Sequence, residues 1–493
     1  MAPEATVKLP SVQHVWAGEQ RHYSLGALQE LLGIRETEAT RKAVQQLCDA
    51  KLLRTLRKGK PQTVFGEDDE ETSDAWDSRH LERYDYSFRC VGLLQFRKRV
   101  LYILPKYCTD WQDTAEKARL STLSTLLQVI TRYRRDTRSL GEEESDEEHL
   151  DFLHTMVELV TDYASNGPYR ADEAINEING RGRILWARTI RRVLPLMQEK
   201  SPYYTDLHTR RRQTDTAYFI TRLHQYLVWQ ARKNLEDIHL AGLLGIPDMA
   251  EAPDHEEEFS DTEYLIHCIR QEQTLRFDNR RRYLLDLMLR YLQAREEQTT
   301  DGIYLYGKSD FHVVWEEACR KALGMAASER EQMLPSVPRW KTESGRVAFG
   351  SELKADMFCY QNGTLLIGDA KYYIPRMQDF RNGNASGMPG IGDIIKQQLY
   401  ELALRHHYGA DIKTRNVFLM PLLDDEKKED TGLITRFGSV SIPMLTEGTP
   451  APPPLRGFCA LQPILLCKVD PDAIWQAYLN RETLFAKFRD SLT

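Results

Sequence analysis

Residues 351–373 read SELKADMFCYQNGTLLIGDAKYY, and this segment decides the fold of the C-terminal part of the chain. The pattern predicts two strands joined by a two-residue Asn-Gly turn. Antiparallel pairing outward from that turn places Asp356 directly opposite Asp369. Opposed Cβ atoms lie about 4.5–5.5 Å apart, so the two carboxylates repel unless a cation lies between them or one takes up a proton. The hairpin therefore predicts a divalent-metal site, for which hard oxygen ligands favour Mg²⁺, with Mn²⁺ as the alternative ion.

Lys371 follows Asp369 by two positions, so it lies on the same face of the same strand. Its ammonium can then reach a metal-bound water or a scissile phosphate. Hydrolysis of a phosphodiester needs an activated water and compensation of growing negative charge, which a metal and a lysine together supply. An isolated D-x-K motif is weak evidence for a nuclease site. Here Asp356, the Asn-Gly turn and the apolar run 365–367 strengthen that evidence. The alternative is an ordinary surface hairpin with one salt bridge.

These residues resemble the PD-(D/E)xK nuclease superfamily, and the larger pattern is similar to the LlaJI family, relatives of the McrC nuclease subunits. The resemblance covers most of the chain. Six segments carry it: VGLLQFRKRVLYILPKY at 91–107, EINGRGRILWARTI at 177–190, SPYYTDLHTRRRQTD at 201–215, FHVVWEEAC at 311–319, the hairpin with DAKYY, and DIIKQQLYELAL at 393–404.

The resemblance implies a role for five residues. Asp356, Asp369 and Lys371 take the superfamily's catalytic positions. Glu316, on the helix with VWEE, is the additional acid, so that the metal ligands are the two aspartates and this glutamate. Gln397 matches the family's glutamine and could orient water or phosphate.

Glu316 and Ala355 match the family pattern less directly than the other residues. Helical spacing does not separate Glu316 from Glu317, because both lie about equally far from the centre of the apolar stripe of their helix. Ala355 replaces the proline that names the superfamily motif. That proline contributes backbone shape and no ligand, so we expect its absence to leave activity intact.

By the same resemblance, the chain is a Mg²⁺-dependent endonuclease subunit of a restriction system for antiviral defence. Its substrate is double-stranded DNA. Its activator is an AAA+ GTPase that forms a hexameric ring similar to McrB. Because one site cuts one strand, double-strand cleavage requires self-association of two copies or two successive cuts.

Residues 302–309, GIYLYGKS, also match the phosphate-loop pattern, so a P-loop NTPase motor subunit is an alternative function. The interior Ile-Tyr-Leu-Tyr is a strand-forming run, and the polar sequence REEQTTD precedes it where a buried strand is required. We therefore expect a strand that ends in a turn at 307–309. A third function, a non-enzymatic DNA-binding adaptor, requires the two aspartates and the lysine to be dispensable.

The formal net charge is −7, yet DNA binding depends on where the charge lies. Acidic residues concentrate in three segments that we expect to be solvated linkers, 66–74, 141–148 and 254–263. Basic clusters elsewhere could meet phosphates. The residues assigned to DNA binding are Arg97, Lys98, Arg99, Arg181, Arg183, Arg210, Arg211 and Arg212. For each cluster, the alternative to DNA binding is an ordinary solvated surface. For residues 97–99, docking on the partner protein is a further alternative.

The 493 residues suggest about three domains at roughly 150 residues each, and the patterns divide the chain into four parts. We predict a multidomain α+β protein: a winged-helix-like domain at 1–75, a small β segment at 76–112 for partner docking or DNA contact, a mainly helical domain at 113–299 and an α/β PD-(D/E)xK nuclease domain at 300–493. A small helical protein-docking module is the alternative for the first part.

The sequence also predicts a cytoplasmic protein. No apolar run approaches the ~20 residues needed to cross a bilayer. The opening MAPEATVKLP lacks the pattern of a secretory signal. The eight cysteines are scattered singly, which favours free thiols over a zinc site or disulfides.

Overall fold

The structure is a computed structural model of a mixed α+β protein. It describes residues 13–57, 84–97, 99–139, 152–198, 201–215, 218–248, 256–275, 278–296, 302–324, 339–341, 343, 346–349, 355–361, 363–375, 387–409, 412–427, 432–442 and 461–492.

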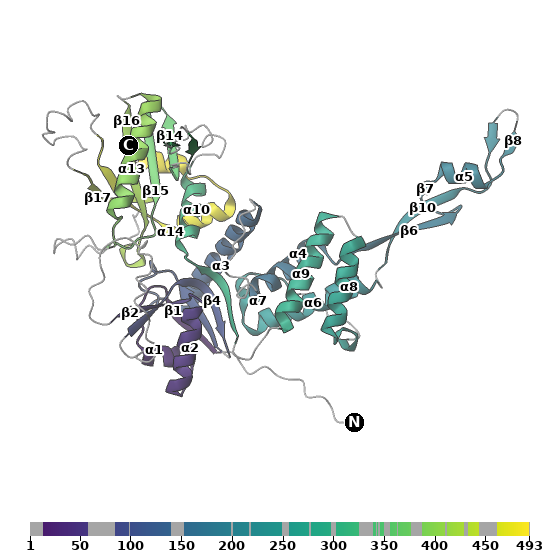
Figure 1. The fold of residues 1–493 in the computed structure, drawn as a ribbon, viewed down its shortest axis with the longest axis horizontal. Coiled ribbons are helices and arrows are strands. Elements are labelled where there is room, and N and C mark those ends of the chain that lie inside the picture. Colours follow the sequence, from purple (N-terminus) through teal and green to yellow (C-terminus); the bar gives the residue numbers. More distant parts are fainter. Residues whose placement is uncertain are drawn as a thin grey trace. The chain divides into compact units, whose positions relative to one another are not determined.

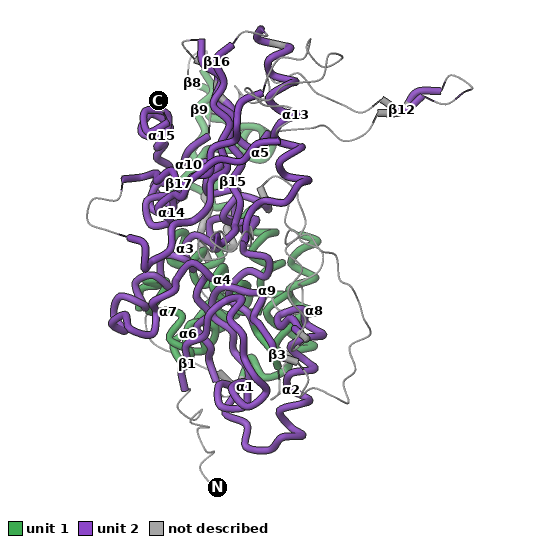
Figure 2. Tube along the Cα trace, turned by 90° about the vertical axis from the view of Figure 1, so that its left-hand side faces the viewer, with its two compact units in different colours: residues 1–12, 147–304 green, residues 13–146, 305–493 purple. Residues whose placement is uncertain are grey.

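Two compact units make up the chain, and both are discontinuous in sequence (Figure 2). Unit 1 contains residues 1–12 and 147–304, and unit 2 contains residues 13–146 and 305–493. These units do not coincide with four successive domains, and the predicted domain boundaries stay predictions.

A four-stranded sheet forms the N-terminal part of unit 2, in the order β1 (Gln13–Gly18), β5 (Arg99–Leu104), β4 (Cys90–Phe96) and β11 (Ile303–Ser309). β4 and β5 are the two strands with a basic turn that the sequence predicts. They are the inner strands, and their side chains are nearly all buried. The strands of this segment are therefore part of the interior of unit 2.

The phosphate-loop pattern forms strand β11, as predicted, although the strand runs on through Ser309 where a turn was expected. Gly307 has a packing role in it. A Cβ at this position would lie 2.3 Å from the Val91 carbonyl oxygen. The glycine thus permits the close approach of β11 to β4.

Two helices and a hairpin lie beside this sheet: α1 (Leu25–Leu32), α2 (Thr37–Asp49), β2 (Leu53–Arg57) and β3 (Tyr84–Phe88). Ser24 caps α1 by accepting a hydrogen bond from the Ala27 amide at 3.2 Å. Gly33 ends α1 in the left-handed conformation that glycine adopts without strain. Thr37 is the first residue of α2, and Glu36 precedes it at the N-cap position. Residues 58–83, between β2 and β3, lie outside the described residues.

The C-terminal part of unit 2 contains a five-stranded sheet in the order β14 (Met357–Gln361), β15 (Thr364–Ala370), β16 (Lys413–Pro421), β18 (Ile464–Val469) and β17 (Ile434–Val440). Gln361 pairs with Thr364 across the turn, which confirms the predicted register. β15, β16 and β18 are parallel, whereas both edge strands are antiparallel to their neighbours. A short ribbon, β12 (Arg339–Lys341) and β13 (Val347–Phe349), belongs to the same unit.

Helices cover this sheet (Figure 1). α13 (Ile391–Tyr408) packs on β15 and β16, and Tyr400 and Leu404 of this helix share a core cluster with Ala355, Phe358 and Ile367. α10 (His312–Leu323) packs against β15, α14 (Pro471–Asn480), α15 (Phe485–Leu492) and α3 (Glu116–Ser139). A short helix, η4 (Asp424–Glu426), follows β16.

Unit 1 is helical at one end, with α4 (Phe152–Asn166), α6 (Phe219–Asp237), α7 (Leu240–Leu243), η3 (Glu256–Phe259), α8 (Thr262–Leu275) and α9 (Asn279–Glu296). The acidic segment 254–263 is therefore a linker only in part, because η3 and the start of α8 fall within it. The acidic segments 66–74 and 141–148 lie outside the described residues.

Between α4 and α6 the chain forms a β arm that the sequence analysis did not predict. The arm contains β6 (Ala171–Ile178), β7 (Arg183–Ile184), α5 (Trp186–Arg192), β8 (Leu196–Gln198), β9 (Ser201–Tyr203) and β10 (His208–Asp215). Within unit 1, the β6–β10 ladder leads away from the helices to α5 and the β8–β9 hairpin (Figure 1). Its strands are rich in charged residues and lack the apolar alternation that marks a half-buried strand.

No helix in the described parts combines the length and apolar character that crossing a bilayer requires. Of the eight cysteines, the six whose side chains are described, at positions 48, 90, 108, 268, 319 and 467, are free thiols, as predicted.

Candidate active site

The hairpin β14–β15 brings the two predicted carboxylates together. Met357 pairs with Gly368, so Asp356 and Asp369 are the next opposed positions. The Asp356 carboxyl lies within hydrogen-bonding reach of Asp369, and Asp369 is only 2% exposed. Burial, together with this neighbouring carboxylate, raises the pKa of Asp369 well above its ordinary value. Asp369 Oδ1 is buried with no hydrogen-bond partner among the described residues.

Lys371 lies on the same face, as predicted. Its Nζ is 3.4 Å from Asp369 Oδ2 and 3.0 Å from Asp393 Oδ1. Burial alone would lower the pKa of Lys371, but the charges of these two aspartates outweigh it and raise the pKa above its ordinary value. The backbone amide of Lys371 donates to the Leu419 carbonyl at 2.8 Å, which fixes the strand end against β16.

The structure separates the two glutamates that helical spacing left equal. Burial raises the pKa of Glu316 to about 7, and its charge interacts with Lys371 and Asp356 of the hairpin. Glu317 instead accepts a hydrogen bond from Arg320 Nε at 2.7 Å and lies 3.3 Å from Lys321 Nζ.

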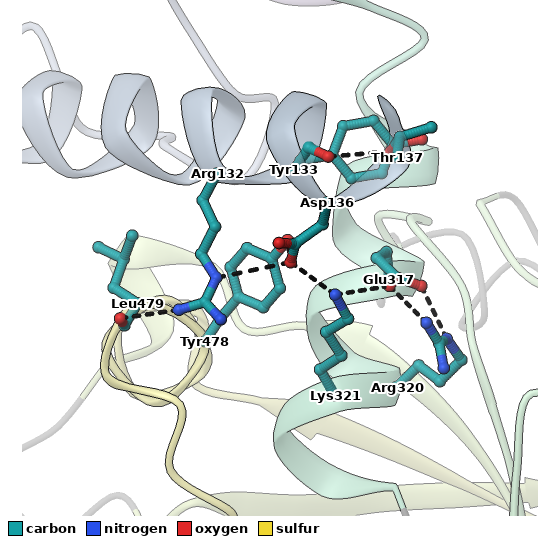
Figure 3. Close-up of polar contacts among 9 residues, drawn as sticks. All are labelled: Arg132, Tyr133, Asp136, Thr137, Glu317, Arg320, Lys321, Tyr478 and Leu479. Carbon is teal, nitrogen blue, oxygen red and sulfur yellow. Dashed lines mark hydrogen bonds and ion pairs between the residues drawn. The ribbon is translucent and has the colours of Figure 1, made fainter. Parts of the chain in front are cut away.

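Figure 3 shows the polar contacts made on the side of α10 that carries Glu317. Lys321 Nζ, which lies near Glu317, also forms an ion pair with Asp136 Oδ2 of α3 at 2.6 Å. Arg132 of α3 donates to the Leu479 carbonyl of α14 at 2.8 Å. Glu317 therefore belongs to an ion-pair network that joins three helices, and Glu316 is the glutamate on the side of the hairpin.

α13 contributes two further side chains. Gln397 is fully buried, and neither its amide oxygen nor its amide nitrogen has a partner among the described residues. Asp393 precedes it by four residues, and therefore lies on the same helix face one turn earlier. Asp393 was not among the residues predicted from sequence. Its place one turn before Gln397, in the first turn of the helix, is the signal that could have found it.

A second group of residues that was not predicted from sequence lies on the face of the strand opposite Lys371. Tyr372 points to the face opposite Lys371, and its hydroxyl donates to Glu19 Oε2 at 2.6 Å. The Lys106 amide also donates to Glu19, at 3.1 Å. The ring of Phe311, 5.6 Å from the Tyr372 ring, belongs to the same buried junction. The N-terminal sheet thus supports the residue next to Lys371.

The residues assigned to DNA binding are divided between the two units. Arg97 and Arg99 flank the β4–β5 turn in unit 2, whereas Lys98 lies outside the described residues. Arg181 and Arg183 are exposed on the arm of unit 1.

In the arm, Arg210 is exposed and pairs directly with Arg183 across β10 and β7, so the structure does bring these two together. Arg211 and Arg212 belong to β10, but their side chains lie outside the described residues.

The donor set suits a hard divalent cation. Asp356 and Asp369 place carboxylate oxygens side by side, with one of them buried and unpartnered, which is the arrangement that a cation relieves. Among the described residues, no three acidic, histidine or cysteine side chains already stand close enough to hold an ion. Glu316 therefore lies near the carboxylate pair without completing a three-ligand site.

Comparison with known proteins gives relatives of one kind. The chain is 26% identical over 414 residues to component YdjA of the type II restriction enzyme BsuMI of Bacillus subtilis, covering 81% of this chain and 82% of that protein. Among solved structures, it is similar to a half-complex from a tetradecameric assembly of Thermococcus gammatolerans McrB AAA+ hexamers with bound McrC. That match has 13% identity and a TM-score of 0.37, over 95% of this chain and 99% of the other.

A second structure, the Thermococcus gammatolerans McrBC complex, matches at 13% identity and a TM-score of 0.23, over 62% of this chain and 85% of the other. Structural similarity at these levels carries no conclusion about this chain. The sequence match is more extensive: residues 90–470 match the LlaJI restriction endonuclease family. The chain therefore belongs to the LlaJI restriction endonuclease family.

Proposed function

We propose that the chain is the catalytic subunit of a restriction system and hydrolyses phosphodiester bonds of double-stranded DNA at the site of Asp356, Asp369 and Lys371. The observation that carries this proposal is the pair of neighbouring carboxylates, of which Asp369 is buried, with a lysine ammonium 3.4 Å from Asp369 Oδ2. Membership of a restriction endonuclease family supports it. On this proposal, the five-stranded sheet with α10 and α13 is a PD-(D/E)xK nuclease domain.

Asp356 and Asp369 would hold Mg²⁺ or Mn²⁺, with Glu316 as the nearby third acid. The ion, when bound, supplies positive charge and lowers the pKa of a bound water. Burial and the neighbouring Asp356 carboxylate raise the pKa of Asp369, and a cation beside it would favour its ionised form.

The chain's own side chains provide the rest of the chemistry. Lys371 presents a fixed positive charge on the face of Asp369, where it compensates negative charge that grows on the scissile phosphate. Gln397 offers a buried amide, with both a donor and an acceptor free among the described residues, to orient the attacking water or a phosphate oxygen.

The alternative function, an NTPase motor subunit, depends on residues 302–309 forming a phosphate loop. A phosphate loop presents successive backbone N–H groups to phosphate, whereas residues 302–309 contain strand β11. Lys308 is buried, and Gly307 is accounted for by its approach to Val91. On our proposal, a separate AAA+ GTPase ring, similar to McrB, hydrolyses the nucleotide and activates cleavage.

We assign partner and DNA contacts to the arm of unit 1. Large apolar side chains are exposed there, and Leu194 is 91% exposed. Such a group of exposed apolar residues is typical of a protein-binding surface. Arg183 and Arg210 lie opposite each other, and two like charges at that spacing are stabilised by an anion such as a DNA phosphate. The helices and hairpin at 24–88 are, on this proposal, a winged-helix-like module.

Cleavage of double-stranded DNA by the full chain, assembled with its GTPase partner, tests the proposal. Lys371→Ala and Asp369→Asn should not cut, and EDTA should stop the wild type, while partner binding persists. Lys413→Ala, an exposed lysine at the start of β16, is the matched control and should cut normally. Cutting by Lys371→Ala at the wild-type rate contradicts the proposal.

A further inference from the structure

The ammonium of Lys371 lies between two carboxylates of different elements. Asp369 Oδ2, 3.4 Å away, belongs to the D-x-K strand. Asp393 Oδ1 is nearer, at 3.0 Å, and belongs to α13. The D-x-K motif contains only the first of these contacts, so the stronger constraint on the lysine comes from outside the motif.

Asp393 is itself held in place by two donors. Its Oδ2 accepts a hydrogen bond from Tyr373 Oη at 3.2 Å and from the Gly390 amide at 3.3 Å. The first donor lies two residues beyond Lys371, on the same face of the extended chain. The second is the backbone at the start of α13, where a negative charge is also favoured by the helix dipole. Asp393 therefore joins the end of the catalytic strand to the start of the helix that carries Gln397.

This arrangement affects what Asp369 can do. If Asp393 were absent, Asp369 would be the only carboxylate in an ion pair with the Lys371 ammonium among the described residues, and the ammonium would move toward it. An ammonium seated on Asp369 competes with a cation for the same oxygens. Asp393 draws the ammonium to one side, while Asp369 Oδ1 stays unpartnered.

We propose that Asp393 is a positioning residue that holds the Lys371 ammonium beside Asp369 Oδ2 and keeps it off Asp369 Oδ1, the oxygen left for the metal. The inference rests on the proposed function. It adds a residue that acts on the reaction through Lys371, and it assigns to the start of α13 the task of aligning the lysine with the carboxylate pair.

Asp393→Asn tests this in the full chain assembled with its partner. The amide keeps an oxygen for the Gly390 and Tyr373 donors but loses the charge that attracts the ammonium. We expect the single-turnover rate of DNA cleavage to fall by about tenfold to hundredfold, with DNA affinity unchanged, because small displacements of a catalytic group cost rates of this size. Tyr373→Phe removes one support of Asp393 and should lower the rate less.

A matched control exists on another helix. Asp472 lies in the first turn of α14 and pairs with Lys427 at 2.7 Å. Asp472→Asn therefore removes the same kind of ion pair away from the site, and cleavage should be unchanged. Labelling of the isolated chain with N-hydroxysuccinimidyl acetate, read by mass spectrometry, gives a measure that does not depend on activity. Asp393→Asn should speed the labelling of Lys371, and Asp472→Asn that of Lys427 only.

Three results overturn the proposal: wild-type cleavage by Asp393→Asn when Lys371→Ala is inactive, loss of DNA affinity in proportion to the loss of rate, or unchanged labelling of Lys371. The first result leaves the proposed function intact. Cleavage by Lys371→Ala at the wild-type rate would instead remove the proposed function itself, so the two failures are distinguishable.

Discussion

The Tyr372 hydroxyl donates a hydrogen bond of 2.6 Å to Glu19, although the two residues are 353 positions apart in the sequence. Both side chains are buried. Lys106 completes the junction, because its amide donates to Glu19 and its ammonium lies 4.3 Å from the centre of the Tyr372 ring. The N-terminal sheet and the end of β15 therefore share one interior within unit 2.

Tyr372→Phe should destabilise unit 2 by about 1–3 kcal/mol, because it removes a buried hydrogen bond of 2.6 Å to the charged Glu19 carboxylate. Urea unfolding measures this. Tyr360→Phe changes an exposed tyrosine on β14 in the same way and should shift the free energy of unfolding by less than about 0.5 kcal/mol. Equal effects of the two substitutions would show that the Glu19 contact contributes nothing.

Glu316→Gln should lower the DNA cleavage rate by about 100-fold, whereas Glu317→Gln should cut nearly normally. The reason is their orientation, since Glu316 interacts with the hairpin and Glu317 with Arg320 and Lys321. Single-turnover cleavage at saturating Mg²⁺ compares the two variants. If Glu317→Gln were instead the less active variant, Glu317 and not Glu316 would be the third acid of the site.

Glu316 should also make stability depend on pH in metal-free protein. Its pKa is about 7 in the folded protein against an ordinary value of 4.5, so the folded chain retains a proton that the unfolded chain has released. This favours folding in full below pH 4.5, and the contribution is lost as pH rises through about 7.

Urea unfolding at pH 5 and pH 8 in EDTA checks this pH dependence. From the lower to the higher pH, the wild type should lose on the order of 1–3 kcal/mol more than Glu316→Gln, which cannot titrate. A variant that loses as much stability as the wild type would show that Glu316 is not the group responsible.

Leu194→Asp should weaken binding of the proposed AAA+ GTPase partner by at least about tenfold without lowering the melting temperature, because an exposed apolar side chain contributes to binding and not to the core. Leu275→Asp is the control, since Leu275 is 66% exposed on α8, outside the arm. Calorimetric titration of the partner measures both. Equal weakening by the two variants would remove the arm from the proposed interface.

Several features follow from the sequence because their causes are local. The Asn-Gly turn sets the hairpin register, and the alternation of side chains along a strand then places Lys371 on the face of Asp369. The Ser24 cap and strand β11 are local in the same sense, as each depends on a few neighbouring residues. These features could be predicted without knowing what packs against them.

The tertiary structure decided the rest, because it depends on which elements meet. Helical spacing leaves Glu316 and Glu317 equal, and only the packing of α10 against α3 and β15 turns one toward the hairpin. Asp393 reaches Lys371 from another element, and Glu19 reaches Tyr372 from the far end of the chain. No periodicity in a single sequence records such contacts, since their geometry arises only when distant segments are buried against one another.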